Sequence, residues 1–310
     1  MSRLLTLAAA LGGFALATHQ AARNAERARA APGRFIAVDG VRLHILDRGP
    51  PAPDGPPVVL LHGNGSMVED FDSSGLIDLL ARHRRVVAID RPGFGRSDRP
   101  RDRDWTPEAQ AALIAAALER LGLVRPIVLG HSFGAVVALA LALDHASRIG
   151  GLVLESGYFF PTLRADAVLF SPPAIPGIGD VIRYTYGPPL GRAVAKPMIR
   201  RMFAPLPVPR RFKREFPLPL TVRPWQIRAV AEDSAAMVPA ARRLSQRLGQ
   251  LHLPVTILAG EEDRIVSPKR QAQRLHAMLP DSRLVLLPGA GHMLHHASPA
   301  VVEEAILSLA

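Results

Sequence analysis

A serine lies at the centre of the most informative stretch of this 310-residue chain. Ser132 is flanked by Gly130 and Gly134, after the apolar run 127–129 and before an Ala/Leu/Val-rich run. This order predicts a sharp strand-to-helix turn, because small glycines let the two backbones close around a strained serine. The hydroxyl would project among the N–H groups of the first helical turn, where it could act as a nucleophile. The alternative is an ordinary strand–helix loop with a capping serine.

A serine nucleophile needs a base and an acid, and suitable residues follow other predicted strands. Asp263 follows the apolar run 255–258, and His292 follows the run 284–287. Because the carboxyl ends of parallel strands meet at one edge of a sheet, we expect Ser132, Asp263 and His292 to lie together. His292 would take the serine proton during attack, and Asp263 would orient the imidazole and stabilise its cation.

Other titratable residues compete for these roles. Glu155 follows a predicted strand at 152–154 and is the alternative acid. His295 and His296 lie near His292 but toward the final helix, so we expect them on the surface. Glu261 and Glu262 are further acid candidates beside Asp263. His62 and His131 are expected to pack or form hydrogen bonds beneath the loops, and Asp90 and Arg91 to be turn and salt-bridge groups.

Strands alternate with helices along most of the chain, which predicts an α/β fold with a mostly parallel, doubly wound sheet. The alternation stops at 158–248, where prolines cluster and 10 of the 16 aromatic residues lie, so we interpret this segment as an inserted helical cap or lid. The core is therefore expected at 34–157 and 249–310, after an N-terminal segment at 1–33. The predicted elements are a hairpin at 35–48, strands at 58–61, 86–89, 127–129, 152–154, 255–258 and 284–287, and helices at 75–83, 106–121, 268–279 and 299–309.

The composition excludes several classes of site. The absence of cysteine excludes disulfides, thiolate metal sites and a cysteine nucleophile. Net charge is +11, and the cap alone carries 15 Lys and Arg against 5 Asp and Glu. This indicates either an anionic partner near the cap or a merely solubilising face. No nucleic-acid-binding motif accompanies the charge. Gly93-x-Gly95 lacks the third glycine of a dinucleotide loop, and no HExxH, P-loop or EF-hand spacing occurs, so no cofactor or metal is predicted.

The amino-terminal segment indicates where the protein resides in the cell. Residues 4–17 are apolar except for Thr6, which is short for a membrane span but suits a signal-peptide core. Arginines that follow, at 23, 27 and 29, could instead retain the segment as an anchor. We expect membrane association through this segment, with the basic cap against an anionic leaflet, or a periplasmic or secreted protein if the segment is cleaved after 15–17. A cytoplasmic helix is the remaining alternative.

Five motifs together resemble the α/β-hydrolase superfamily over about residues 34–310, in its capped branch of esterases, cofactor-free perhydrolases, epoxide hydrolases and dehalogenases. They occur in the order typical of that family: HGNG at 62–65, DRPGFGRS at 90–97, GHSFG at 130–134, EEDRIVSP at 261–268 and GAGH at 289–292.

The resemblance implies a Ser132–His292–Asp263 triad, with the backbone N–H groups of Asn64 and Phe133 as the oxyanion hole. Dehalogenases and epoxide hydrolases of this fold resemble one another in using an aspartate where Ser132 stands. A serine favours hydrolysis of esters, thioesters, lactones or certain C–C bonds. We therefore expect a serine hydrolase that cleaves small apolar carboxylic esters through an acyl-enzyme. The alternatives are an acyltransferase or perhydrolase with the same triad, or a non-catalytic binding protein.

Overall fold

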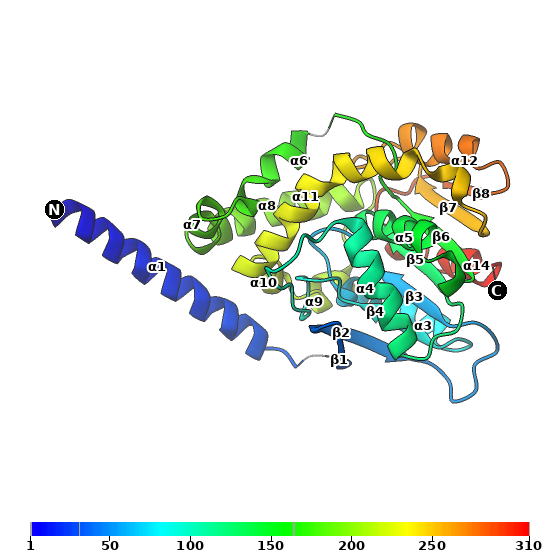
Figure 1. Cartoon of the computed structure of the whole chain (residues 1–310), viewed down its shortest axis with the longest axis horizontal. Coiled ribbons are helices and arrows are strands. Elements are labelled where there is room, and N and C mark those ends of the chain that lie inside the picture. The colour runs from blue at the N-terminus through cyan, green and yellow to red at the C-terminus, as the bar shows by residue number, and fades with distance from the viewer. Residues whose placement is uncertain (1, 31, 164, 310) are drawn as a thin grey trace.

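The strands form one eight-stranded sheet, in the order β1-β2-β4-β3-β5-β6-β7-β8 (Figure 1). The computed structural model describes residues 2–30, 32–163 and 165–309. From β4 to β8 all neighbouring strands are parallel, whereas the β1–β2 and β2–β4 pairs are antiparallel. The strands are β1 (Arg34–Val38), β2 (Val41–Arg48), β3 (Val58–Leu61), β4 (Val86–Ile89), β5 (Ile127–His131), β6 (Gly151–Glu155), β7 (Val255–Gly260) and β8 (Arg283–Leu287).

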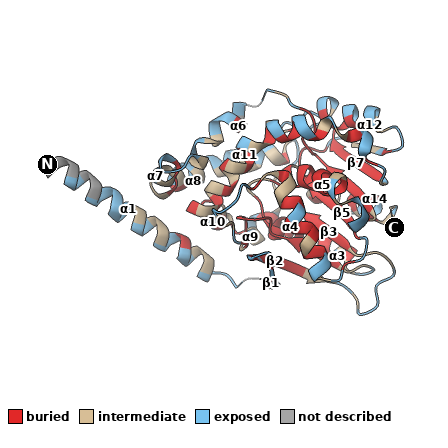
Figure 2. Cartoon of the chain, in the orientation of Figure 1, coloured by how far each residue is buried: buried red, intermediate tan, exposed pale blue. Residues whose placement is uncertain are grey.

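Helices cover both faces of this sheet, which confirms the predicted α/β fold. The central strands are buried from end to end (Figure 2). Apolar side chains must therefore occupy both faces of each strand, so the sequence reads as continuous apolar runs instead of an alternation. One face packs on helices α2 (Val68–Ser74), α3 (Leu76–Leu80) and α14 (Pro299–Leu307), and the other on α4 (Pro107–Arg120), α5 (Phe133–Asp144), α11 (Pro224–Ser245) and α12 (Arg274–Met278).

Two predicted helices differ in detail, and two short helices were not predicted. The helix expected at 75–83 is the shorter α3, and the unpredicted α2 precedes it and ends at Gly75, whose φ is 86°. The helix expected at 268–279 begins as a π-helical turn at Lys269–Gln273 and continues as α12. A short helix that the sequence analysis did not predict, α13 (Leu294–Ala297), follows β8. It carries His295 and His296.

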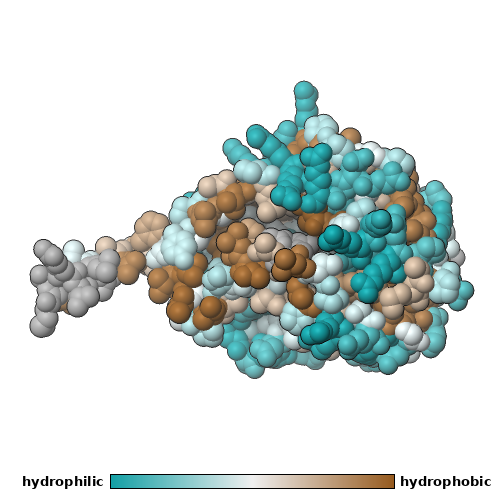
Figure 3. All heavy atoms as spheres, turned by 90° about the horizontal axis from the view of Figure 1, so that it is seen from above, coloured by the Kyte–Doolittle hydropathy of each residue, from teal (hydrophilic) through white to brown (hydrophobic). Residues whose placement is uncertain are grey.

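The segment between β6 and β7 is helical. Its longest helix, α11, reaches back over the sheet edge and contacts α5. Many large apolar side chains of the segment remain exposed, and Figure 3 shows apolar side chains gathered near helix α1. The other helices of this segment are α6 (Ala165–Phe170), α7 (Ile178–Tyr184), α8 (Gly187–Phe203), α9 (Arg210–Glu215) and α10 (Leu218–Thr221), with short 3-10 turns at Pro172–Ala174 and Leu248–Gln250.

Helix α1 (Ser2–Arg27) projects from the body of the molecule (Figure 1). It contacts α7, α10 and α11, and Glu26 forms an ion pair with Arg223 at 2.6 Å. Within the described residues, no helix combines the length and the apolar character that crossing a membrane requires. This finding contradicts the membrane-associated or secreted location expected from residues 1–33. Polar residues begin at Thr18, and the apolar run before them covers only about 21 Å of a 30 Å hydrocarbon layer. Met1 and Ala31 of that segment lie outside the described residues.

Candidate active site

Ser132 occupies a strained turn between β5 and α5. Its φ of 54° and ψ of −117° are unusual for a residue with a side chain. The turn is held by a 2.8 Å hydrogen bond from the Ser132 N–H to the Glu155 carbonyl oxygen on β6. The flanking residues must be glycines, because there is no space for a side chain at either position. A Cβ at Gly130 would lie 2.4 Å from the Gly134 carbonyl oxygen, and a Cβ at Gly134 would lie 2.1 Å from the Leu61 carbonyl oxygen.

Asp263 and His292 form a hydrogen-bonded pair. Asp263 Oδ2 lies 2.8 Å from His292 Nδ1, and both side chains are buried. The other carboxylate oxygen accepts backbone N–H groups of Ile265 at 2.7 Å and Val266 at 2.9 Å. Burial alone would raise the pKa of Asp263, but His292 and these N–H groups lower it below its usual value. An ionised carboxylate at Nδ1 keeps the proton on that nitrogen, which leaves Nε2 as the basic atom.

His292 lies beside the serine turn. His131, which directly precedes Ser132, has its ring centroid 4.9 Å from that of His292. His131 Nε2 donates to the His292 carbonyl oxygen at 3.1 Å. Burial lowers the pKa of His131 to about 3, so this ring is neutral and serves as a fixed support. The structure thus brings Ser132, His292 and Asp263 to one edge of the sheet.

The loop after β3 also lies against the serine. A Cβ at Gly63 would be 3.1 Å from Ser132 Cβ, so there is little room for a side chain between the loop and Ser132. Phe133 opens helix α5, so its N–H is one of the helix-start donors that lack an intrahelical acceptor. Asn64 follows the loop, with its side-chain Nδ2 donating to the Val230 carbonyl oxygen and to Ser234 Oγ on α11.

Arg91 fixes the orientation of this loop. The fully buried guanidinium donates to the carbonyl oxygens of His62 at 2.8 Å and Gly63 at 3.1 Å. The Gly63 carbonyl and the Asn64 N–H belong to one planar, trans peptide and therefore point in opposite directions. By holding the carbonyl, Arg91 directs the Asn64 N–H to the other side of that plane.

The cap helix α11 completes this arrangement. Asp233 accepts from Arg91 at 2.6 Å, and from Arg99 and Gln110 at 3.1 Å each. Gln110 also accepts from Arg91 at 2.8 Å. Because Asp233 and Arg91 are completely buried, this network joins α11 to the loop after β3 without exposure to water. We expected Arg91 to be a turn and salt-bridge residue, and it does form a salt bridge, but we did not anticipate its partner Asp233. An arginine within the DRPGFGRS motif was the available signal, whereas nothing in the sequence indicated its partner.

The competing residues form a separate cluster. Glu155 Oε1 lies 2.6 Å from His295 Nδ1 and accepts the His295 backbone N–H at 3.0 Å, so it pairs with His295 and not with His292. The prediction that His295 and His296 lie on the surface was wrong, because their side chains are 0% and 1% exposed. Helix α13 turns them inward toward Asp70 on α2.

Comparison with known proteins agrees with this fold. The model for the "alpha/beta hydrolase fold" family matches residues 56–299. Haloalkane dehalogenase 2 of Mycobacterium bovis is 29% identical over 279 residues, covering 86% of this chain and 90% of the relative. The 2-hydroxy-6-oxo-2,4-heptadienoate hydrolase of Pseudomonas putida is 29% identical over 272 residues, covering 84% and 89%. The crystal structure of an enol-lactonase from Burkholderia xenovorans LB400 has a TM-score of 0.72 at 21% identity, covering 89% of this chain and 99% of that one. The chain belongs to the α/β-hydrolase fold family.

Proposed function

We propose that this chain is a serine hydrolase that cleaves carboxylic esters through an acyl-enzyme. The observation that carries the proposal is the strained turn at Ser132 next to the hydrogen-bonded pair of Asp263 and His292. The relatives are hydrolases, which fits the general reaction class. The dehalogenases that this chain resembles use an aspartate nucleophile at this position. Ser132 stands there in this chain and favours acyl transfer instead.

In this mechanism, Ser132 Oγ attacks the ester carbonyl carbon while His292 Nε2 takes the hydroxyl proton. The carbonyl oxygen becomes an oxyanion, which the N–H groups of Asn64 and Phe133 stabilise by roughly 3–4 kcal/mol per donor. Asp263 stabilises the imidazolium cation. Collapse of the intermediate expels the alcohol, which takes its proton from His292. Water then hydrolyses the acyl-enzyme with His292 again acting as the base.

A fluorescent fluorophosphonate tests the nucleophile directly. We expect it to label wild-type protein at Ser132 alone, as mapped by peptide analysis, and to leave Ser132→Ala unlabelled. A series of p-nitrophenyl esters of increasing chain length then tests ester hydrolysis. Absence of labelling in folded protein would contradict the proposal and favour a non-catalytic binding protein.

Acyltransferase and perhydrolase activities use the same three residues and differ in what attacks the acyl-enzyme. Added alcohols or hydrogen peroxide compete with water at that step. If an acceptor raises substrate turnover and diverts the acyl group from the free acid, transfer is the preferred reaction. If the acid remains the main product, the enzyme is a hydrolase.

A further inference from the structure

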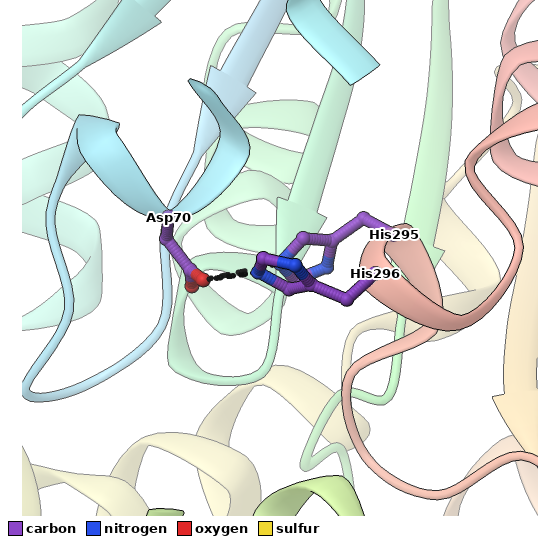
Figure 4. A group of neighbouring side chains, drawn as sticks. All are labelled: Asp70, His295 and His296. Atoms are coloured by element: carbon purple, nitrogen blue, oxygen red, sulfur yellow. Dashed lines mark hydrogen bonds and ion pairs between the residues drawn. The ribbon is translucent and has the colours of Figure 1, made fainter. Parts of the chain in front are cut away.

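Three potential metal ligands from distant parts of the chain converge (Figure 4). Asp70 comes from α2, and His295 and His296 come from α13, 226 residues further along the chain in the case of His296. Asp70 Oδ1 lies 2.9 Å from His296 Nε2 and 3.4 Å from His295 Nε2. One ligand atom from each residue lies within 4.8 Å of the other two.

One nitrogen in this cluster is unsatisfied. His295 Nε2 is fully buried and has no hydrogen-bond partner among the residues that the structure describes, although it faces Asp70. Buried polar atoms are nearly always paired, and an unpaired one requires an explanation. Asp70 Oδ1 forms its closer ion pair with His296 Nε2 at 2.9 Å, and its ion pair with His295 Nε2 at 3.4 Å lacks hydrogen-bond geometry. A metal ion between the three residues would satisfy it.

The surrounding contacts orient these ligands as outer-sphere groups do in metal sites. His295 directs its other ring nitrogen, Nδ1, at Glu155 Oε1 at 2.6 Å, and a ligand histidine characteristically donates that N–H to a carboxylate. The second oxygen of Asp70 accepts from Ser66 Oγ at 2.8 Å, which fixes the carboxylate. Aromatic rings enclose the site: Phe71 against His295, and Phe203 and Phe212 against His296.

Two imidazoles and a carboxylate match the ligand preference of Zn²⁺. Tetrahedral zinc places its ligand atoms roughly 3.4 Å apart, close to the separation of His295 Nε2 and Asp70 Oδ1, whereas His296 Nε2 at 2.9 Å from Asp70 Oδ1 would have to move away by about 0.5 Å. Burial alone would lower the pKa of His295, but Glu155 and Asp70 raise it to about 10, so the metal ion must displace a proton from this ring. We propose that Asp70, His295 and His296 bind a divalent transition-metal ion, with zinc as the best match. The overlapping group of His131, Glu155 and His295 suits an ion less well, because His295 Nδ1 is already bonded to Glu155.

Such an ion would join two segments that position the candidate site. Helix α2 follows the loop after β3, and α13 begins two residues after His292. A bond across them would stabilise the loop that carries the base. This site could not be predicted from the sequence, because Asp70 is far along the chain from the two histidines and the ligands form no HExxH spacing. The inference is independent of the proposed function, since it concerns metal binding and stability.

The test uses the full chain, stripped with a chelator and dialysed, and titrated with Co²⁺ and then Zn²⁺. We expect one equivalent of Co²⁺ to give the visible absorption of a tetrahedral site and Zn²⁺ to displace it. Zinc at a hundredfold excess over its dissociation constant should raise the melting temperature by roughly 5 °C.

The diagnostic variant is His296→Gln, which retains an amide donor to Asp70 but removes the imidazole ligand. We expect it to lose the Co²⁺ absorption and the zinc-dependent melting shift. His83→Gln is the matched control, because His83 is an exposed histidine that also pairs with an aspartate, Asp54. Failure of folded wild-type protein to bind one equivalent would overturn the proposal, as would undiminished binding by His296→Gln verified as folded by circular dichroism.

Discussion

Glu155 Oε1 lies 2.6 Å from His295 Nδ1, so the carboxylate at the end of β6 is committed to a histidine outside the proposed triad. His292 instead has its Nδ1 on Asp263 at 2.8 Å. Two buried acid–histidine pairs thus lie side by side, linked by His131, whose ring centroid is 4.9 Å from that of His292 and 4.7 Å from that of His295. Both pairs contact the serine turn through a backbone carbonyl: Glu155 accepts the Ser132 N–H at 2.8 Å, and His292 accepts from His131 Nε2 at 3.1 Å.

This arrangement predicts opposite results for two isosteric substitutions. Asp263→Asn should lower kcat for ester hydrolysis by about 10²- to 10⁴-fold, because the amide no longer fixes the imidazole tautomer or stabilises its cation. Glu155→Gln should leave kcat within about threefold of wild type, since its partner is His295. The measurement is steady-state kinetics on one ester, with melting curves to verify folding. A larger loss in Glu155→Gln than in Asp263→Asn would assign the acid to Glu155.

Backbone strain at Ser132 predicts a trade between stability and activity. Glycine adopts positive φ without steric cost, so Ser132→Gly should raise the free energy of unfolding by about 1 kcal/mol. Ser132→Ala removes the same hydroxyl but retains Cβ, and is the control that should give no such gain. Both variants should lose at least about 10⁴-fold in kcat. Urea denaturation supplies the comparison, and equal stabilities of the two variants would show that the turn is not strained.

The buried pair of Arg91 and Asp233 predicts that the cap helix affects catalysis. Asp233→Ala should cost about 3–5 kcal/mol in the free energy of unfolding, because it leaves Arg91 buried without its carboxylate. It should also lower kcat by up to about 10²-fold with little change in KM, because the peptide that orients the Asn64 N–H is no longer held.

The matched control for this pair is Asp102→Ala, which breaks an exposed contact with Arg103 and should leave the free energy of unfolding almost unchanged. If Asp233→Ala destabilises the protein but leaves kcat unchanged in folded enzyme, Arg91 has only a structural role.

Features that depend on residues close together in the sequence could be predicted. The strands at 58–61 and 86–89 begin and end as predicted, because continuous apolar runs of this length fit a sheet buried on both faces. The helix expected at 106–121 begins at an N-cap, where Thr106 accepts the Ala109 N–H and Pro107 lies in the first helical turn. Features that depend on distant contacts were missed. The burial of His295 is set by Glu155 and Asp70, and the role of Arg91 by Asp233, so neither could be inferred from neighbouring residues.

The environment of His62 predicts a loss of stability in acid. His62 is fully buried, and its Nε2 accepts the Arg91 backbone N–H at 2.9 Å while Nδ1 bonds to the Gly63 carbonyl oxygen. Burial, with the nearby Arg91 cation, lowers the pKa of His62 from 6.5 to about 4. Between these values the unfolded chain binds a proton that the folded chain does not. Stability therefore falls as the pH falls through this interval, at up to about 1.4 kcal/mol per pH unit.

His62→Gln removes this titration while its side-chain oxygen can still accept the Arg91 N–H. The free energy of unfolding, measured in urea at about pH 7 and pH 5, should therefore fall by about 2 kcal/mol less in the variant than in wild type. His83→Gln removes an exposed histidine and should retain the wild-type difference. An unchanged difference in His62→Gln would mean that His62 does not resist protonation in the folded protein. The loss of stability in acid would then come from the protonation of other groups, and not from His62 in the loop whose carbonyl groups accept from Arg91.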